Sequence, residues 1–460
     1  MSSVDAGGLA SRSAREAMAA LATQVELLDL GAVSRDPLGW PGYQEQLARA
    51  RRLSGEPESV LVACARLGDT DVVLVALDFR FMGGSMGEAA GERIVAAFSE
   101  AQRRRVPIVS LVSTGGARMQ EGMPALVQMQ RIARACATAR AYGIPHLAVL
   151  RHPTTGGIWA SLAADADIVL ALPEAIVAFA GPRVRTATGA AHDGRPFTAE
   201  GKQEDGFVDH VLEEEHLRDA VALAARLLAP RSRGALRPAA VPRALGLRDP
   251  ARAPRGWQSV VSARAPGRPR AEAYLDDYFA ARVGIRGDRC GGVDDGMLCG
   301  FGLRDGRTVA YAAQNGTATT PAGFRTATRL IRLAERFDLP VLTLIDTPGA
   351  ANGVEAEREG VGTAIAELLQ TVASCRVPVT SLVVGEGGSG GALALAHPDR
   401  LWIVPDGYFA VIAPEGAAAI LERDTSRAPA LADRMALAPA DLVDLGIVAG
   451  IASAQHADAA

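Results

Sequence analysis

An internal duplication is the feature that most constrains how this chain can fold. Two apolar segments, each led by a proline, recur with one offset of 233 residues, from Pro107 to Pro340 and from Pro145 to Pro378 (340 − 107 and 378 − 145). The glycine pairs Gly156-Gly157 and Gly390-Gly391 lie 234 residues apart (390 − 156). Anchors that keep one offset to within a residue predict two copies of one domain.

Each copy alternates short β-rich runs, glycine turns and longer amphipathic segments. Helices are predicted within residues 125–142 and 361–374, each between two apolar runs. This alternation predicts an α/β fold in each half, with buried strands covered by helices. The expected units are a helical or frayed leader at 1–32, a first domain at 33–229, a linker at 230–254 and a second domain at 255–460.

Composition excludes several classes of protein. Apolar residues make up 48% and charged residues 22%, which is typical of a soluble globular chain. No apolar run approaches the ~20 residues of a membrane span, and the start lacks the apolar core of a secretory signal, so we expect a cytoplasmic protein without membrane contact. A net charge of −4 offers no basic footprint for nucleic acid. Five cysteines without metal-ligand spacing indicate buried thiols in a reducing compartment.

The two glycine pairs are the candidate catalytic groups. Each pair stands where a β-rich run ends and a helical run begins, in HPTTGGIWASLA and GEGGSGGALALA. The first N–H groups of a helix lack intrahelical acceptors and lie at the positive end of its dipole, so they can donate to an oxyanion. A single glycine pair more often serves close helix packing. A matched pair in both copies favours catalysis, and we predict Gly156, Gly157, Gly390 and Gly391 as oxyanion donors.

Side chains that usually carry acid–base or nucleophilic chemistry are not arranged in familiar motifs. The sequence has no HExxH or GxxxxGK[ST] pattern. His152, just before the first glycine pair, is interpreted as a local hydrogen-bonding residue rather than a base. Chemistry would therefore depend on backbone donors and on substrate orientation.

Long stretches around these glycines resemble a known family. In the first half they are DFRFMGGSMGEAAGERI (78–94), STGGARMQEG (113–122), PTTGGIWASLA (153–163) and AFAGPRV (178–184). They are similar to the β-subunit of bacterial acetyl-CoA carboxylase carboxyltransferase. In the second half, the segments 323–350, GEGGSGGALALA (385–396) and APEGAAAIL (413–421) resemble its α-subunit. The resemblance covers residues 33–229 and 255–453.

The resemblance implies two tandem crotonase-like domains, each a spiral of ββα units, and a homodimer in which a first half meets a second half at the active site. It also implies that the first half binds acyl-CoA and the second half receives carboxybiotin. The carboxyl group would pass to acetyl-CoA or a related acyl thioester, to form malonyl-CoA or its homologue. Biotin carboxylase and the biotin carboxyl carrier protein are expected as separate chains, because no MKM-like biotinylation sequence is present.

The same resemblance implies roles for residues beside the oxyanion glycines. Those expected to bind substrate are Gly115, Gly116, Ala117, Arg118, Gly181, Arg183, Gly349 and Gly388. Among them, Arg118 and Arg183 are candidates for phosphate contacts. Which glycine pair holds the thioester and which holds the biotin stays open.

The chain also departs from the family pattern. β-Subunits usually begin with a four-cysteine zinc ribbon, whereas no cysteine here precedes Cys64, so no zinc is expected. NGTATTPAGF and GAANGVEAE replace family-typical loops of the second half. These loops fall where an acyl group or biotin would lie, so the identity of the acyl group stays open.

Two other functions fit the sequence. A malonyl-thioester decarboxylase, or a carboxyltransferase of specialised metabolism acting on another acyl thioester, would use the same enolate pocket. A catalytically silent scaffold paralogue is the third possibility, although both retained glycine pairs argue against it.

Overall fold

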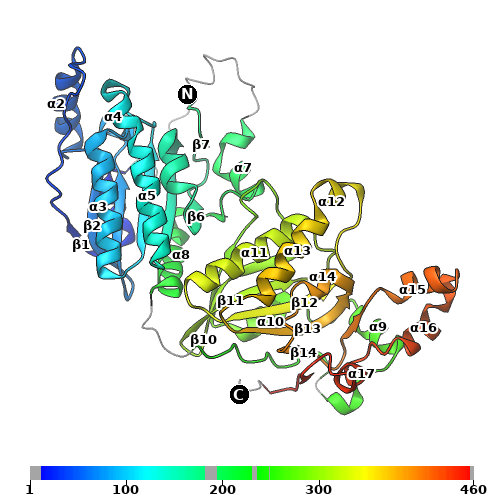
Figure 1. Ribbon diagram of the computed structural model, residues 1–460. Helices are drawn as coiled ribbons and strands as arrows, with labels where there is room; N and C mark the ends of the chain where they lie inside the picture. The colour runs from blue at the N-terminus through cyan, green and yellow to red at the C-terminus, as the bar shows by residue number, and fades with distance from the viewer. Residues whose placement is uncertain (1–11, 182–193, 231–235, 248, 456–460) are drawn as a thin grey trace. The chain divides into compact units, whose positions relative to one another are not determined.

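Residues 12–181, 194–230, 236–247 and 249–455 are described in the computed structural model (Figure 1). The chain divides into two compact units, residues 1–232 and 233–460. Each unit contains an eight-stranded mixed sheet with helices packed on it. The predicted α/β fold of each half is thereby confirmed.

In the first unit, three antiparallel strands lead into a parallel series. The strand order is β1-β2-β3-β4-β5-β6-β8, and the short β7 pairs with β5. The strands are β1 (Thr23–Leu27), β2 (Val60–Leu67), β3 (Thr70–Leu77), β4 (Ile108–Thr114), β5 (His146–Thr155), β6 (Ile168–Ala171), β7 (Val177–Ala178) and β8 (His210–Val211). The helices are α1 (Ala14–Leu21), α2 (Tyr43–Ser54), α3 (Glu88–Arg104), α4 (Met123–Leu126), α5 (Gln128–Ala141), α7 (Ala199–Glu204) and α8 (Glu214–Leu228).

The second unit repeats this topology. Its strand order is β9-β10-β11-β12-β13-β14-β16, and the short β15 pairs with β13. The strands are β9 (Ala281–Ile285), β10 (Met297–Arg304), β11 (Arg307–Gln314), β12 (Val341–Thr347), β13 (Val379–Gly388), β14 (Leu401–Ile403), β15 (Tyr408–Ala410) and β16 (Gly450–Ile451). The helices are α9 (Trp257–Ala263), α10 (Ala271–Tyr278), α11 (Pro321–Arg336), α12 (Val354–Arg358), α13 (Val361–Ala373), α14 (Ser389–Leu393), α15 (Pro414–Leu421), α16 (Ala428–Arg434) and α17 (Pro439–Asp444).

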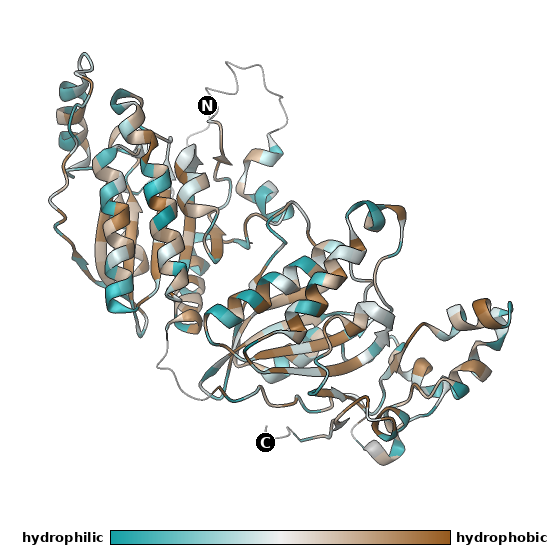
Figure 2. Cartoon of the chain, viewed as in Figure 1, coloured by the Kyte–Doolittle hydropathy of each residue, from teal (hydrophilic) through white to brown (hydrophobic). Residues whose placement is uncertain are grey.

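Both faces of each sheet are buried at its centre, because successive side chains point to opposite faces and β4 and β12 are buried along their whole length. In the first unit, Val73, Val75 and Leu77 of β3 pack in one core with Ile94 of α3 and Ile132 of α5. Figure 2 shows the strands coloured as hydrophobic and the outer sides of the helices mostly as hydrophilic. The helices predicted within 125–142 and 361–374 correspond to α4 with α5 and to α13. Figure 1 shows α3 beside α5, and α11 beside α13.

Parts of the expected leader and linker belong to the units. Residues 14–21 form α1, whose buried Ala14, Met18 and Leu21 cover the first sheet, and β1 pairs with β2. In the expected linker, the buried residues Ala239 and Val241 pack in the core of the second unit. The docking of α1 is explained by its apolar residues at helical spacing, because these residues stabilise the helix only when they are buried.

A test of this docking is the replacement Ser13→Ala. The Ser13 hydroxyl accepts from the Glu16 N–H (3.1 Å), and the Glu16 carboxylate accepts from the Ser13 N–H (2.8 Å), which together form a capping box. Loss of such a cap costs about 1 kcal/mol. Urea denaturation should show that loss in the free energy of unfolding if α1 is part of the folded unit. An unchanged midpoint would contradict its docking.

Candidate active site

The first glycine turn of the first half follows β4 and is held in place by hydrogen bonds of its backbone to Thr114 and Met86. Gly116 has φ +110° and donates its N–H to Thr114 Oγ1 (3.0 Å). Its carbonyl accepts from the Met86 N–H (2.9 Å), and the Met86 carbonyl accepts from the Arg118 N–H (2.8 Å). No described residue accepts a hydrogen bond from the intervening Ala117 N–H. This turn therefore presents one free, half-buried backbone donor.

The second turn of the first half follows β5 and touches the first. A Cβ added at Gly156 would lie 2.6 Å from Gly116 Cα, so the two backbones are in contact. The Gly156 N–H donates to the carbonyls of Ala178 (3.1 Å) and Phe179 (3.0 Å). Gly157 begins a helical turn, where an N–H has no intrahelical acceptor, and no described residue accepts from it.

This geometry corrects the predicted role of Gly156. We expected both glycines of the pair to donate to an oxyanion, but the Gly156 N–H is already used twice within the fold. Gly156 instead supplies the left-handed bend, at φ +76°, and the close approach of the two turns. The free donors of the first half are Ala117 and Gly157.

The second half reproduces the same turns. Gly349, at φ +141°, donates its N–H to Thr347 Oγ1 (3.1 Å). Its carbonyl accepts from the Thr319 N–H (3.0 Å), and the Thr319 carbonyl accepts from the Ala351 N–H (2.8 Å). Between them, no described residue accepts from the Ala350 N–H. Gly390 lies in the first turn of α14, directly after β13.

Around the glycine turns, the structural offset between the two halves is 233. The bridge Met86–Ala117 corresponds to the bridge Thr319–Ala350 (319 − 86 and 350 − 117). The same offset relates Gly157 to Gly390 and Gly156 to Ser389, which has φ +56°. Pairing the two double glycines directly, with an offset of 234, is therefore wrong. Gly391 packs its Cα against the first turn, where an added Cβ would overlap Ala350 N.

Arg118 does not contact a phosphate in this fold. Its side chain is fully buried and pairs with Glu58 (2.5 Å) and Glu121 (3.0 Å). It also donates to Ser34 Oγ (2.6 Å) and to the Ser85 carbonyl (2.7 Å). The predicted phosphate contact is wrong, because a guanidinium enclosed by two carboxylates has no donor left for a ligand. Arg118 instead anchors the loop that follows the first turn.

The remaining predicted residues lie around the turns. Gly115 donates its N–H to the Gly83 carbonyl (2.8 Å). Gly388 ends β13 with its Cα against Pro348, so a side chain at Gly388 would overlap the Pro348 carbonyl. Gly181 lies near the end of β5, since an added Cβ would be 3.8 Å from Thr155 Oγ1. Arg183 lies outside the described residues.

His152 has the local role that the sequence indicated. Its Nδ1 accepts a hydrogen bond from the Ile176 N–H (3.3 Å), and its carbonyl accepts from Ser113 Oγ (3.0 Å). The ring therefore holds β7 beside β5 rather than facing a substrate as a base.

Sequence reasoning missed a charged layer beneath the second-half turns. Asp346, fully buried in β12, pairs with Arg268 (2.5 Å) and accepts from the Glu386 N–H (3.1 Å). Glu386, at the end of β13, pairs with Arg264 (2.9 Å). Arg264 also pairs with Glu415 (2.6 Å). Burial alone would raise the pKa of Glu415, but the hydrogen bond and charge of Arg264, together with a backbone hydrogen bond, outweigh burial and lower that pKa. The sequence signal that could have identified this charged layer is the acidic residue that precedes each glycine turn of the second half.

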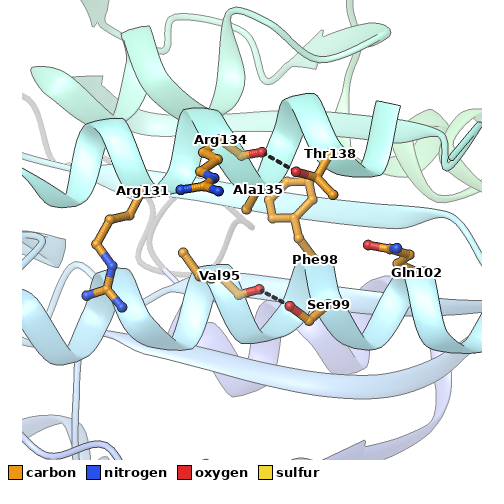
Figure 3. Close-up of a pocket in the computed structure, with 8 residues that line it drawn as sticks. All are labelled: Val95, Phe98, Ser99, Gln102, Arg131, Arg134, Ala135 and Thr138. Carbon is orange, nitrogen blue, oxygen red and sulfur yellow. Dashed lines mark hydrogen bonds between the residues drawn. The ribbon is translucent and has the colours of Figure 1, made fainter. Parts of the chain in front are cut away.

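A cavity of about 280 Å³ lies between α3 and α5 (Figure 3). It is lined by Val95, Phe98, Ser99, Gln102, Arg131, Arg134, Ala135 and Thr138. None of these residues belongs to the glycine turns. The backbone donors, not this cavity, therefore define the candidate active site.

Both halves of the chain are similar to known proteins. Residues 45–252 match the family described as carboxyl transferase domain, and residues 252–459 match the family described as acetyl co-enzyme A carboxylase carboxyltransferase-like. The chain is 40% identical over 448 residues to the acetyl-coenzyme A carboxylase carboxyl transferase subunits beta/alpha of Salinispora arenicola, covering 92% of this chain and 79% of that protein. The chain belongs to this carboxyltransferase family.

Further relatives of this carboxyltransferase carry similar names. The corresponding beta/alpha protein of Clostridium tetani is 34% identical, covering 92% of this chain and 75% of that protein. A probable biotin-dependent acyl-coenzyme A carboxylase beta3 subunit of Mycobacterium bovis is 36% identical, covering 90% of this chain and 84% of that protein.

Solved structures show the same fold. Transcarboxylase 12S aligns with a TM-score of 0.77 at 19% identity, covering 96% of this chain and 87% of that chain. A single-chain, multi-domain long-chain acyl-CoA carboxylase aligns with a TM-score of 0.76 at 18% identity, covering 96% of this chain and 45% of that chain. The crotonase-like fold expected from the sequence is thereby confirmed.

Two features are absent from the described parts of the carboxyltransferase. No helix there combines the length and the apolar character that crossing a bilayer requires. Within the same residues, no three His, Cys, Asp or Glu side chains gather as metal ligands would.

Proposed function

We propose that this carboxyltransferase moves a carboxyl group from carboxybiotin, held on a separate carrier protein, to acetyl-CoA or a related acyl thioester. The observation that carries the proposal is the repeated donor arrangement. Ala117 and Gly157 present free N–H groups in the first half, and Ala350 and Gly390 occupy the equivalent positions in the second. One set suits a thioester carbonyl, and the other suits the ureido carbonyl of biotin.

The chain's own residues would act by placing charge rather than by moving protons. Backbone donors fixed at both turns need no reorganisation when negative charge develops on the thioester oxygen as the enolate forms. Carboxybiotin itself would supply the carboxyl group and, once this has left, the base for the α-proton. This assignment of roles is consistent with His152, just before the first glycine pair, being engaged in holding β7.

The second-half turn has room for a ring system. A Cβ added at Gly390 would have no atom within 4 Å. A bicyclic urea, whose ureido ring is planar, can therefore bring its carbonyl to the Gly390 N–H without meeting a side chain at this position. The buried pair Arg268–Asp346 and the partly buried pair Arg264–Glu386 hold the strands on which this turn is built.

The proposal includes the expected partners. Biotin carboxylase and the biotin carboxyl carrier protein would be separate chains, and the complex would work in the cytoplasm. We further propose a homodimer in which the first half of one copy faces the second half of the other. A dimer predicts that specific activity falls on dilution to nanomolar concentration, and a fully active monomer would contradict it.

Incubation of the purified protein with malonyl-CoA and either free biotin or biotinylated carrier tests the function. We expect carboxybiotin and acetyl-CoA to form together, in equal amounts. CO₂ release without biotin would instead identify a malonyl-thioester decarboxylase. No turnover with either acceptor, together with no binding of acyl-CoA, would indicate a scaffold.

A further inference from the structure

The donor turn of the first half is closed on one side by a methionine. A Cβ added at Gly157 would overlap Met129 Sδ and would lie 3.0 Å from its Cε and 3.1 Å from its Cγ. Met129 is in the first turn of α5 and packs, half-buried, against the core of the first unit. Its thioether is thus held against the residue that carries a free oxyanion donor.

The equivalent position of the second half is open. The offset of 233 relates Met129 to Gly362, in the first turn of α13. A Cβ added at Gly362 would have no atom within 4 Å, and neither would one at Gly390. The two turns have equivalent backbone donors but different surroundings. The Met129 thioether borders the turn of the first half, and no described side chain takes its place in the second half.

We propose that Met129 is a specificity-determining residue that limits the acyl chain to short lengths. The inference rests on the proposed function. An acyl carbonyl that accepts from the Gly157 N–H places its α-carbon and the rest of its chain beside the Met129 side chain. A two- or three-carbon acyl group fits next to the thioether, whereas each further methylene must displace it. Gly362 leaves the second site wide enough for the fused rings of biotin.

The expected size of the change in acyl-chain preference follows from how strongly apolar pockets discriminate between chains that differ by one methylene group. One methylene too many or too few in an apolar pocket changes specificity by about 10–200-fold. Replacement of Met129 by alanine removes three heavy atoms, so the space gained is that of a short alkyl extension. Methionine is unbranched and polarizable, and leucine, of similar size, is the substitution that best preserves this boundary.

The experiment measures equilibrium binding of acetyl-, butyryl- and hexanoyl-CoA to the full-length chain, and their carboxylation with carboxybiotin as the carboxyl donor. The wild type should favour acetyl-CoA over hexanoyl-CoA by at least about tenfold, both in binding and in kcat/KM. Met129→Ala should remove or reverse this preference, and Met129→Leu should keep it. The matched control is Met123→Ala, since Met123 is 63% exposed on α4 and should leave the preference unchanged.

A reciprocal variant tests the open second site. Gly362→Met should weaken turnover with free biotin on the order of tenfold without changing the acyl-chain preference. An unchanged acyl preference in folded Met129→Ala, or a wild type that does not discriminate chain length, overturns the proposal while leaving carboxyl transfer intact. Failure of the proposed function looks different, because the wild type would then form no carboxybiotin from malonyl-CoA and biotin.

Discussion

Gly156→Ala should lower kcat for carboxyl transfer by about 10²–10³-fold in a protein that still folds. A Cβ at this position would lie 2.6 Å from Gly116 Cα and 3.4 Å from its N, and neither backbone atom can rotate away. The two turns must separate, which moves the Ala117 and Gly157 N–H groups off the shared oxygen. Loss of one such donor typically costs the stated factor. Formation of carboxybiotin from malonyl-CoA measures the result.

The control for this prediction is Gly68→Ala. Gly68, in the turn between β2 and β3, also has a left-handed backbone (φ +54°), but an added Cβ there meets nothing within 4 Å. Both variants carry the left-handed strain, about 1–2 kcal/mol, and only Gly156→Ala separates the turns. Gly68→Ala should therefore keep wild-type kcat. A Gly156→Ala protein within tenfold of wild-type activity would remove the two donor turns of the first half from the mechanism.

The repeat itself could be predicted, but the role of each glycine could not. The sequence offset of 233 already relates Gly157 to Gly390, and matching double glycines by residue type shifted the pairing by one. Serine at position 389 shows why residue type misleads here. This position needs a left-handed backbone, which Ser389 adopts at φ +56° in an exposed setting, whereas Gly156 also needs room for Gly116. That second requirement depends on a neighbour 40 residues away in the chain.

Arg118 shows a different limit of sequence reasoning. Its position in the STGGAR segment indicated a ligand contact, but its partner Glu58 lies just before β2, 60 residues earlier. No local sequence pattern indicates that two charges far apart in the chain will be buried together.

The segments that dock on the two units are intermediate cases. The apolar residues of α1 have a helical spacing that could have been recognised in the sequence, whereas Ala239 and Val241 form too short a pattern to be recognised.

Arg118→Ala should lower the free energy of unfolding by about 3–5 kcal/mol, because it leaves two buried carboxylates without their counter-charge. Glu58 and Glu121 are both fully buried, and no arginine other than Arg118 forms an ion pair with them among the described residues. Urea denaturation at pH 7 measures the loss. Arg103→Ala is the matched control, since its pair with Glu100 is exposed and should leave the midpoint unchanged.

The pH dependence separates lost charge pairing from lost packing. In the wild type, burial alone would raise the pKa of Glu58, but the charge and hydrogen bonds of Arg118 lower it below its ordinary value. A lowered pKa stabilises the fold above the unfolded-state pKa of about 4.3, and this stabilisation is lost as the pH falls through the folded-state value. In Arg118→Ala, burial dominates and raises the pKa of Glu58, so acidification from pH 7 to pH 5 should narrow the gap to the wild type. A gap that stays constant over this range would mean that Arg118 stabilises the fold through packing rather than through its charge.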